Sequence, residues 1–295
     1  MNSNRLHDHK SFFKYVSADT AKIILSTRKL RWSMPALFND PFDVPKELFD
    51  GIDSGRLHSA ILSKIESLIA NPDLPFPEHH TAMTKALLAA FSMASDAEKS
   101  GLLNQVGLLE AGTGSQAFNN MREQWRLMYG EQRILCFSER WDSSSMWDRY
   151  SDGHKGACLE FACIDQLDSV WLMARPVKYT DDPLHVNTPE GLAGLMLYNI
   201  DFAVARIIEE CTHTKTTDWE AEKEWRVASW KLQCEIGDHS DYGFLPTELV
   251  GVTFGACTSG DHRAALTKLV HECYPHAELW QASIEGGRKL TRVKS

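Results

Sequence analysis

A change of hydrophobic pattern between residues 55 and 130 constrains the fold of this chain more than any other feature. Apolar residues recur there at helical spacing in "GRLHSAILSKIESLIA", "TAMTKALLAAFSMAS", "DAEKSGLLNQVGLLEAG" and "SQAFNNMREQWRLMYG", with polar breaks between them. The runs on either side, such as SFFKYV (11–16) and RILCFSE (133–139), are short, aromatic and β-branched instead. We therefore expect a helical insertion or subdomain over 55–130.

The remainder of the chain predicts strands and helices in irregular alternation. A helix is expected over 189–211, which begins with Pro-Glu-Gly, and further strands and a helix follow toward the C-terminus. The absence of a steady strand–helix–strand rhythm favours an α+β fold with a mixed or antiparallel sheet over a doubly wound one. The 295 residues fit a single domain, 1–295, that carries the insertion.

Charge and targeting signals limit the classes of function. The net charge of −9 argues against a protein that coats nucleic acid through its phosphates, although it leaves room for a small basic site. The polar start MNSNRLHDHK lacks the apolar core of a signal peptide, and no run of about 18 to 20 apolar residues is present. Seven cysteines without a C-x-x-C pair fit a reducing compartment, so we expect a cytoplasmic protein that does not enter a membrane.

Familiar cofactor and metal signatures are missing. The chain has no G-x-x-x-x-G-K-[ST], no G-x-G-x-x-G and no G-x-S-x-G. The pairs that suggest metal ligands are His7 with His9, His79 with His80, Cys211 with His213, and His271 with Cys273. None has a second pair at zinc-finger spacing, so no metal site is expected.

The stretch DWEAEKEWRVASW (218–230) is rich in carboxylates. As a strand, which the Val and Trp residues favour, it places Glu220, Glu222, Glu224 and Arg226 on one face. As a helix it contains two pairs at i,i+4 spacing: Glu220 repels Glu224, and Glu222 attracts Arg226. Spacing alone favours a solvated edge strand, whereas carboxylates on a shielded face raise the pKa of at least one of them.

Aromatic, hydroxyl and basic side chains, which are suited to ligand binding, are dense in the segment CFSERWDSSSMWDRYSDGHKGACLEF (136–161). Ser138 ends a predicted strand, and Trp147 and Tyr150 share one face of a short helix. His154 and Lys155 stand at a turn before the next strand, where they can meet a planar or anionic ligand. The competing interpretation is an aromatic core contact beside a polar turn.

Two earlier segments appear structural when each is considered alone. In FFKYVS (12–17) the alternation of a strand directs Phe13 and Tyr15 to one side and Lys14 to the other. In FNDPFD (38–43) Asn39 and Asp40 can cap local backbone groups of a constrained turn.

Taken in order, these segments resemble the signature of a widespread bacterial family of unknown function that is grouped with the ADP-ribosyltransferase-like folds. The resemblance rests on "FKYVS", "FNDPFD", "CFSE", "MWDRYSDGHKG", "V.Y" and "K…W..E.EWR", and it covers residues 12–43, 134–179 and 215–230. It implies a split mixed or antiparallel sheet with flanking helices that binds NAD+ in a cleft, with 55–130 inserted outside the shared motifs.

The resemblance also implies roles for individual residues. Many such enzymes carry an E-x-E pair late in the domain, which here is Glu222-x-Glu224, with Glu224 catalytic and Glu222 orienting the acceptor. The first strand offers Lys14 and Tyr15 where the family supplies His or Arg to the nucleotide. The implied NAD+-binding set is Lys14, Tyr15, Asn39, Ser138, Trp147, Tyr150, His154, Lys155 and Arg226.

The expected function is therefore an ADP-ribosyltransferase-like enzyme that uses NAD+ to modify a macromolecule, either nucleic acid or protein. A toxin or anti-phage effector, with an antitoxin or other partner protein, fits that expectation. One alternative is an inactive module of the same fold that binds a nucleotide or a partner. Another is a metal-dependent nuclease that draws its carboxylates from Asp40, Asp43, Glu222 and Glu224.

Overall fold

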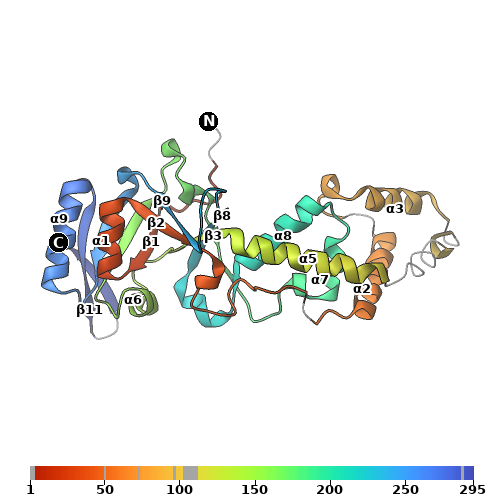
Figure 1. Cartoon of the computed structure of the whole chain (residues 1–295), viewed down its shortest axis with the longest axis horizontal. Helices are drawn as coiled ribbons and strands as arrows, with labels where there is room; N and C mark the ends of the chain where they lie inside the picture. The colour runs from red at the N-terminus through yellow and green to blue at the C-terminus, as the bar shows by residue number, and fades with distance from the viewer. Residues whose placement is uncertain (1–3, 50, 72–73, 96–97, 102–111, 287–288) are drawn as a thin grey trace. The chain divides into compact units, whose positions relative to one another are not determined.

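The computed structural model describes residues 4–49, 51–71, 74–95, 98–101, 112–286 and 289–295 (Figure 1). Contacts divide the chain into two compact units. The first comprises Met1–Asp40, Gly130–Thr180 and Lys215–Ser295, and the second comprises Pro41–Tyr129 and Asp181–Thr214. The chain therefore crosses from one unit to the other four times.

The first unit is built on a ten-stranded sheet in the order β12-β11-β10-β4-β1-β3-β2-β9, with β8 paired to β3 and β5 paired to β8. Its strands are β1 (Ser11–Val16), β2 (Lys29–Ser33), β3 (Gln132–Ser138), β4 (Ala157–Ala162), β5 (Arg175–Pro176), β8 (Glu224–Trp230), β9 (His239–Gly243), β10 (Leu249–Phe254), β11 (Glu278–Glu285) and β12 (Lys289–Lys294). A separate two-stranded pair joins β6 (Lys178–Tyr179) and β7 (Thr214–Lys215), where the chain leaves and re-enters this unit.

Helices and short helical turns connect the strands of this unit. The α-helices are α1 (Ala18–Thr27), α6 (Ser144–Tyr150) and α9 (Gly260–Cys273). The 3₁₀ turns are η1 (Pro35–Leu37), η3 (Asp165–Leu167), η4 (Val170–Met173), η6 (Thr217–Glu222) and η7 (Pro246–Glu248). In the ten-stranded sheet β10 and β11 run parallel and the other described pairs run antiparallel. The α+β class and the mixed sheet expected from the sequence are confirmed, and the sheet is open and largely antiparallel.

The sheet is nearly split between β1 and β3. Strand β1 pairs with β4 through six consecutive positions, but it meets β3 only through Phe13 opposite Ser138. Beyond that point the Lys14 side chain bridges the two strands, because its Nζ donates to the main-chain oxygen of Cys136 at 2.8 Å. Lys14 thus satisfies a backbone acceptor at the split.

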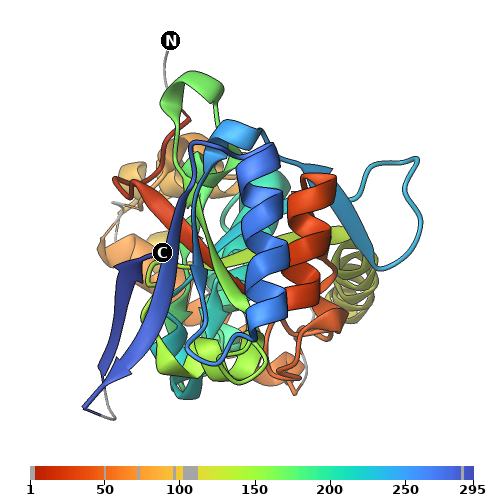
Figure 2. The same cartoon turned by 90° about the vertical axis from the view of Figure 1, so that its left-hand side faces the viewer.

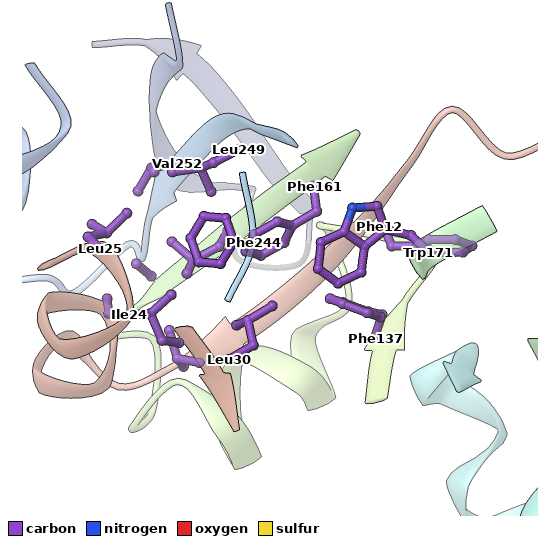
Figure 3. Packing of buried hydrophobic residues seen from close by; sticks show 14 of the residues in the cluster. Phe12, Ile24, Leu25, Leu30, Phe137, Phe161, Trp171, Phe244, Leu249 and Val252 are labelled. Atoms are coloured by element: carbon purple, nitrogen blue, oxygen red, sulfur yellow. The ribbon is translucent and has the colours of Figure 1, made fainter. Parts of the chain in front are cut away.

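Period-two alternation along the strands creates two cores. On one face, α1 and α9 lie side by side across the sheet (Figure 2) and cover a cluster that includes Phe12 and Val16. Figure 3 shows the aromatic part of this cluster, which contains Phe12, Phe137, Phe161, Trp171 and Phe244. On the other face α6 covers a smaller cluster that contains Phe13, Tyr15, Met146, Trp147, Cys158 and Ala282. The SFFKYV strand therefore fills both cores, as its alternation predicts.

The second unit is helical in its described residues. Its helices are α2 (Ser54–Ala70), α3 (Ala82–Met93), α5 (Gly112–Glu131, which ends in the first unit), α7 (Pro189–Leu195) and α8 (Ile200–Thr212), with 3₁₀ turns η2 (Pro77–His79) and η5 (His185–Asn187). Three of the four helices expected over 55–130 are present, and most of the remaining one, from residue 96 on, lies outside the described residues. No described helix has the length and apolar character that crossing a membrane requires.

The single helix expected over 189–211 is wrong, because the structure divides it into α7 and α8. Asn199 makes the break. Asn199 has an extended backbone, and its side-chain oxygen accepts from the amide of Phe202 at 3.0 Å. Asn199 is therefore the N-cap of α8.

Candidate functional site

The glutamate-rich stretch does not form one continuous strand. Residues Thr217–Glu222 form the 3₁₀ turn η6, and Lys223 ends it with a left-handed φ of 45° before β8 begins at Glu224. The prediction of a strand from residue 218 is therefore wrong for its first part. The turn separates the glutamates: Glu220 is exposed, with its side chain 58% accessible, whereas Glu222 and Glu224 are both buried.

The two buried carboxylates meet at a shared ammonium group. Lys215 Nζ donates to Glu222 Oε2 at 2.8 Å and to Glu224 Oε2 at 3.1 Å. Arg226, two residues further along β8, donates from Nε to Glu224 Oε1 at 2.8 Å and from Nη2 to Glu224 Oε2 at 3.1 Å. We call Lys215, Glu222, Glu224 and Arg226 the charge cluster; all four side chains are buried.

Two tyrosines and a cysteine complete the surroundings of the carboxylates. Tyr150 at the end of α6 donates its hydroxyl hydrogen to Glu222 Oε1 at 2.9 Å. The Tyr179 hydroxyl oxygen accepts from the backbone amide of Glu224 at 2.8 Å and so anchors the start of β8. Burial raises the pKa of the Cys136 thiol, and the neighbouring Glu224 charge raises it further, which leaves the thiol protonated.

The two carboxylates differ in their acidity. Burial alone raises the pKa of Glu224, but the Arg226 and Lys215 charges and the hydrogen bonds from Arg226 and Cys136 outweigh it and hold this pKa at about 2. Burial also raises the pKa of Glu222, and here the single ammonium of Lys215 does not compensate, so its pKa lies above the ordinary value. The pair therefore combines a carboxylate that is ionised at neutral pH with one that takes up a proton more readily.

The solvent side of the charge cluster is lined by Arg149 and Trp219. Arg149 Nη1 lies 3.6 Å from Glu222 Oε1, and its side chain is 41% accessible against 2% for Glu222. The Arg149 guanidinium carbon lies 4.3 Å from the Trp219 ring centroid, and Lys215 Nζ lies 4.4 Å from the same ring. These distances are within the range of cation–π attraction.

Two of the residues predicted to bind NAD+ hold the backbone around the charge cluster. Ser138 stands opposite Glu224 in the β3–β8 register, and its hydroxyl donates to the main-chain oxygen of Glu222 at 2.7 Å. The Tyr15 hydroxyl donates to the main-chain oxygen of Arg140 at 2.8 Å and accepts from the amide of Ser143 at 3.2 Å. Both fix the loop that links β3 to α6.

The other predicted residues of the 136–161 segment are placed differently. Trp147 is wholly buried, with Nε1 donating to the main-chain oxygen of Trp141 at 2.8 Å. His154 stacks on Trp147 at 6.0 Å between ring centroids and has a left-handed φ of 64°. Lys155 is 63% accessible and its nearest described charge is Asp152 at 4.0 Å. This part of the segment forms a core contact beside a polar turn.

The FNDPFD turn contributes less to the charge cluster. Asn39 is exposed, and the ring of the neighbouring Phe38 lies 5.2 Å from the Arg226 guanidinium carbon. Asp40 is buried and is the last residue of the first segment of the first unit, whereas Asp43 belongs to the second unit. Over the described part of the chain, no three His, Cys, Asp or Glu side chains are grouped so that they could hold a metal ion.

Several residues of the site carried a signal in the sequence but no predicted role. Lys215 and Tyr179 stand in the motifs K…W..E.EWR and V.Y, yet each lies in a two-residue strand, so neither has a periodic pattern around it. Arg149 stands one residue before Tyr150 in the helical MWDRY run, and this adjacency was its one available signal. Trp219 lies in η6, where it contacts Arg149 and Lys215.

Comparison with known proteins finds similarity to one family model. No curated protein and no solved structure matches the chain significantly. One family model matches residues 146–227, a range that contains Arg149, Tyr150 and the whole charge cluster. The relationship to ADP-ribosyltransferases stays a prediction. What the comparison supports is that residues 146–227 match the family described as "Protein of unknown function (DUF2971)".

Proposed function

We propose that the chain is an ADP-ribosyltransferase-like enzyme that uses NAD+, with Glu222 and Glu224 as its catalytic carboxylates. The observation that carries this proposal is the meeting of both glutamates of the E-x-E pair at one buried ammonium, Lys215, beside a tyrosine hydroxyl. The nearly split mixed sheet, on which β8 begins with Glu224 opposite the end of β3, supports it further.

The difference in acidity suits the chemistry of NAD+ cleavage. As the bond between ribose C1′ and nicotinamide breaks, positive charge develops on the ribose, and nicotinamide leaves with the bonding electron pair. Glu224, held ionised at a pKa of about 2, supplies the negative charge that stabilises this centre in a site largely shielded from water. Glu222, with its raised pKa, accepts the proton of the attacking acceptor group as a general base.

The acceptor in this proposal is a macromolecule, nucleic acid or protein, as for a toxin or an antiviral effector. The acidic balance of the chain disfavours extended binding to a phosphate backbone, so a nucleic-acid acceptor has to be recognised locally.

Nicotinamide release from NAD+ tests the proposed reaction directly. Glu224→Gln preserves shape and removes the charge, so we expect it to abolish release, and Glu222→Gln to lower it. Glu220→Gln is the matched control. It makes the same substitution on an exposed side chain, whose described ion pair is with Lys223. Full activity of a folded Glu224→Gln protein would show that the assignment is wrong.

A binding module of the same fold is the second candidate. The observation in its favour is that both Glu224 oxygens already accept from Lys215 and Arg226, which offsets the negative charge that catalysis requires. For such a module, NAD+ raises the unfolding temperature but no nicotinamide appears in any condition. An enzyme gives both signals, and the same protein sample serves for both measurements.

A further inference from the structure

Arg149 lies at the candidate site but has no role in the reaction proposed above. It lies on α6, and it is the more exposed of the two described cations that pair with Glu222, the other being Lys215. Its stack on Trp219 holds the guanidinium in place without a hydrogen bond. Arg149 is therefore positioned by an aromatic ring and left open toward solvent.

The hydrogen-bonding capacity of Arg149 sets it apart from the other cations at the site. Lys215 and Arg226 donate to the cluster carboxylates at 2.8 to 3.1 Å. Within the part of the chain that the structure describes, the Arg149 side chain makes no hydrogen bond, and its charged partner is Glu222 at 3.6 Å. A guanidinium has five N–H donors in a planar fork that fits phosphate or carboxylate oxygens in pairs.

We propose that Arg149 binds the diphosphate of the substrate at the solvent side of the charge cluster, and that this draws its guanidinium away from Glu222. The identity of the ligand as the NAD+ diphosphate rests on the proposed function, whereas anion binding by Arg149 does not. Bidentate pairs between arginine and phosphate are shorter and stronger than a 3.6 Å ion contact, so the anion competes well with Glu222 for the guanidinium.

The proposed movement links substrate binding to the state of the catalytic carboxylate. While Arg149 faces Glu222 it covers the solvent side of a side chain that is otherwise enclosed by Lys215 and Tyr150. When Arg149 turns to the diphosphate, Glu222 becomes accessible to an acceptor and loses a nearby positive charge. The two contacts are thermodynamically linked. A bound anion weakens the Arg149–Glu222 contact, and the Glu222 charge weakens anion binding by the same factor.

The test measures binding of inorganic pyrophosphate and of ADP-ribose by calorimetry, at constant ionic strength, with adenosine as the ligand that lacks phosphate. Arg149→Gln should weaken both phosphate ligands about tenfold or more, as expected for a charge-assisted bidentate pair. Arg149→Lys should recover only part of the affinity, since lysine lacks the fork. Arg31→Gln is the matched control, because Arg31 is 61% accessible and also lies 3.6 Å from a carboxylate, that of Asp241.

A second variant gives the proposal an independent test. Glu222→Gln removes the competitor for Arg149, so pyrophosphate should bind this variant more tightly than the wild-type chain. Equal pyrophosphate affinity in Arg149→Gln and wild type, or weaker binding by Glu222→Gln, overturns the inference. If pyrophosphate binds as expected and no nicotinamide is ever released, the inference about Arg149 stands and the proposed enzymatic function fails.

Discussion

Replacement of Lys215 by methionine tests whether the charge cluster is held together as the structure indicates. Methionine keeps an unbranched buried side chain but removes the ammonium that Glu222 and Glu224 share at 2.8 and 3.1 Å. Glu224 retains Arg226, whereas Glu222 keeps only the Tyr150 hydroxyl and the partly exposed Arg149. Removal of one partner from a buried ion pair costs about 3–5 kcal/mol, and we expect Lys215→Met to lose stability in that range at pH 8.

The loss in Lys215→Met should depend on pH with a definite sign. Burial already raises the pKa of Glu222 above its ordinary value, and Lys215 is the main influence that lowers it, so the variant raises it further. A carboxyl group with a higher pKa in the folded than in the unfolded state costs nothing below the unfolded value of about 4.3. Its cost grows as the pH rises toward the folded pKa. The stability deficit should therefore shrink from pH 8 to pH 4.5.

Urea unfolding followed by tryptophan fluorescence measures this deficit, since the chain has nine tryptophans. Lys223→Met is the control: Lys223 pairs with exposed Glu220 at 3.0 Å, and a surface pair of this kind contributes about 0–1 kcal/mol. The reasoning is refuted if Lys215→Met unfolds within about 1 kcal/mol of wild type at pH 8. A deficit that is equally large at pH 4.5 refutes the assignment of the cost to Glu222.

Three further predictions concern the same unit. Glu222→Gln should gain stability relative to wild type as the pH rises from 4.5 to 8, because the amide removes a carboxyl that ionises at a cost; the difference in urea midpoints across pH checks this. Tyr150→Phe removes the hydrogen bond that lowers the pKa of Glu222, so the pH profile of nicotinamide release should shift upward. Gly255→Ala should lower the free energy of unfolding by about 1–3 kcal/mol, since the added Cβ would fall 2.1 Å from the main-chain oxygen of His154. In the same urea assay Gly260→Ala should be nearly neutral, because its Cβ would meet no neighbouring atom within 4 Å.

Local patterns predicted the sheet well where the alternation of apolar residues was strict. The SFFKYV run directs Phe12 and Phe13 to opposite faces, and both become core residues of β1. The order of strands was not accessible in the same way, because the pairing of β1 with β4 and of β10 with β11 depends on packing across the whole unit. The α+β class follows from local patterns, whereas the split between β1 and β3 follows from tertiary contacts.

The errors arose where polar side chains outweigh apolar spacing. The Asn199 side chain caps α8 and interrupts a helix that the apolar pattern continues through. In the glutamate stretch, the left-handed Lys223 ends η6 and brings Glu222 and Glu224 to one ammonium, which no period of 2.0 or 3.6 predicts. The E-x-E pair and the lysine of the K…W..E.EWR motif were visible in the sequence, but the contact between them was not.

The separation in sequence of the charge cluster has a consequence for folding kinetics. Lys215 reaches Glu222 and Glu224 across seven and nine residues, whereas the Lys14 bridge to Cys136 spans 122 residues. Closure of a loop of about ten residues takes about 10–100 ns, far less than a long-range strand pairing. The ion pairs can thus be sampled in water before the sheet assembles around them, and they gain most of their strength when β8 is buried, since an exposed pair contributes only about 0–1 kcal/mol.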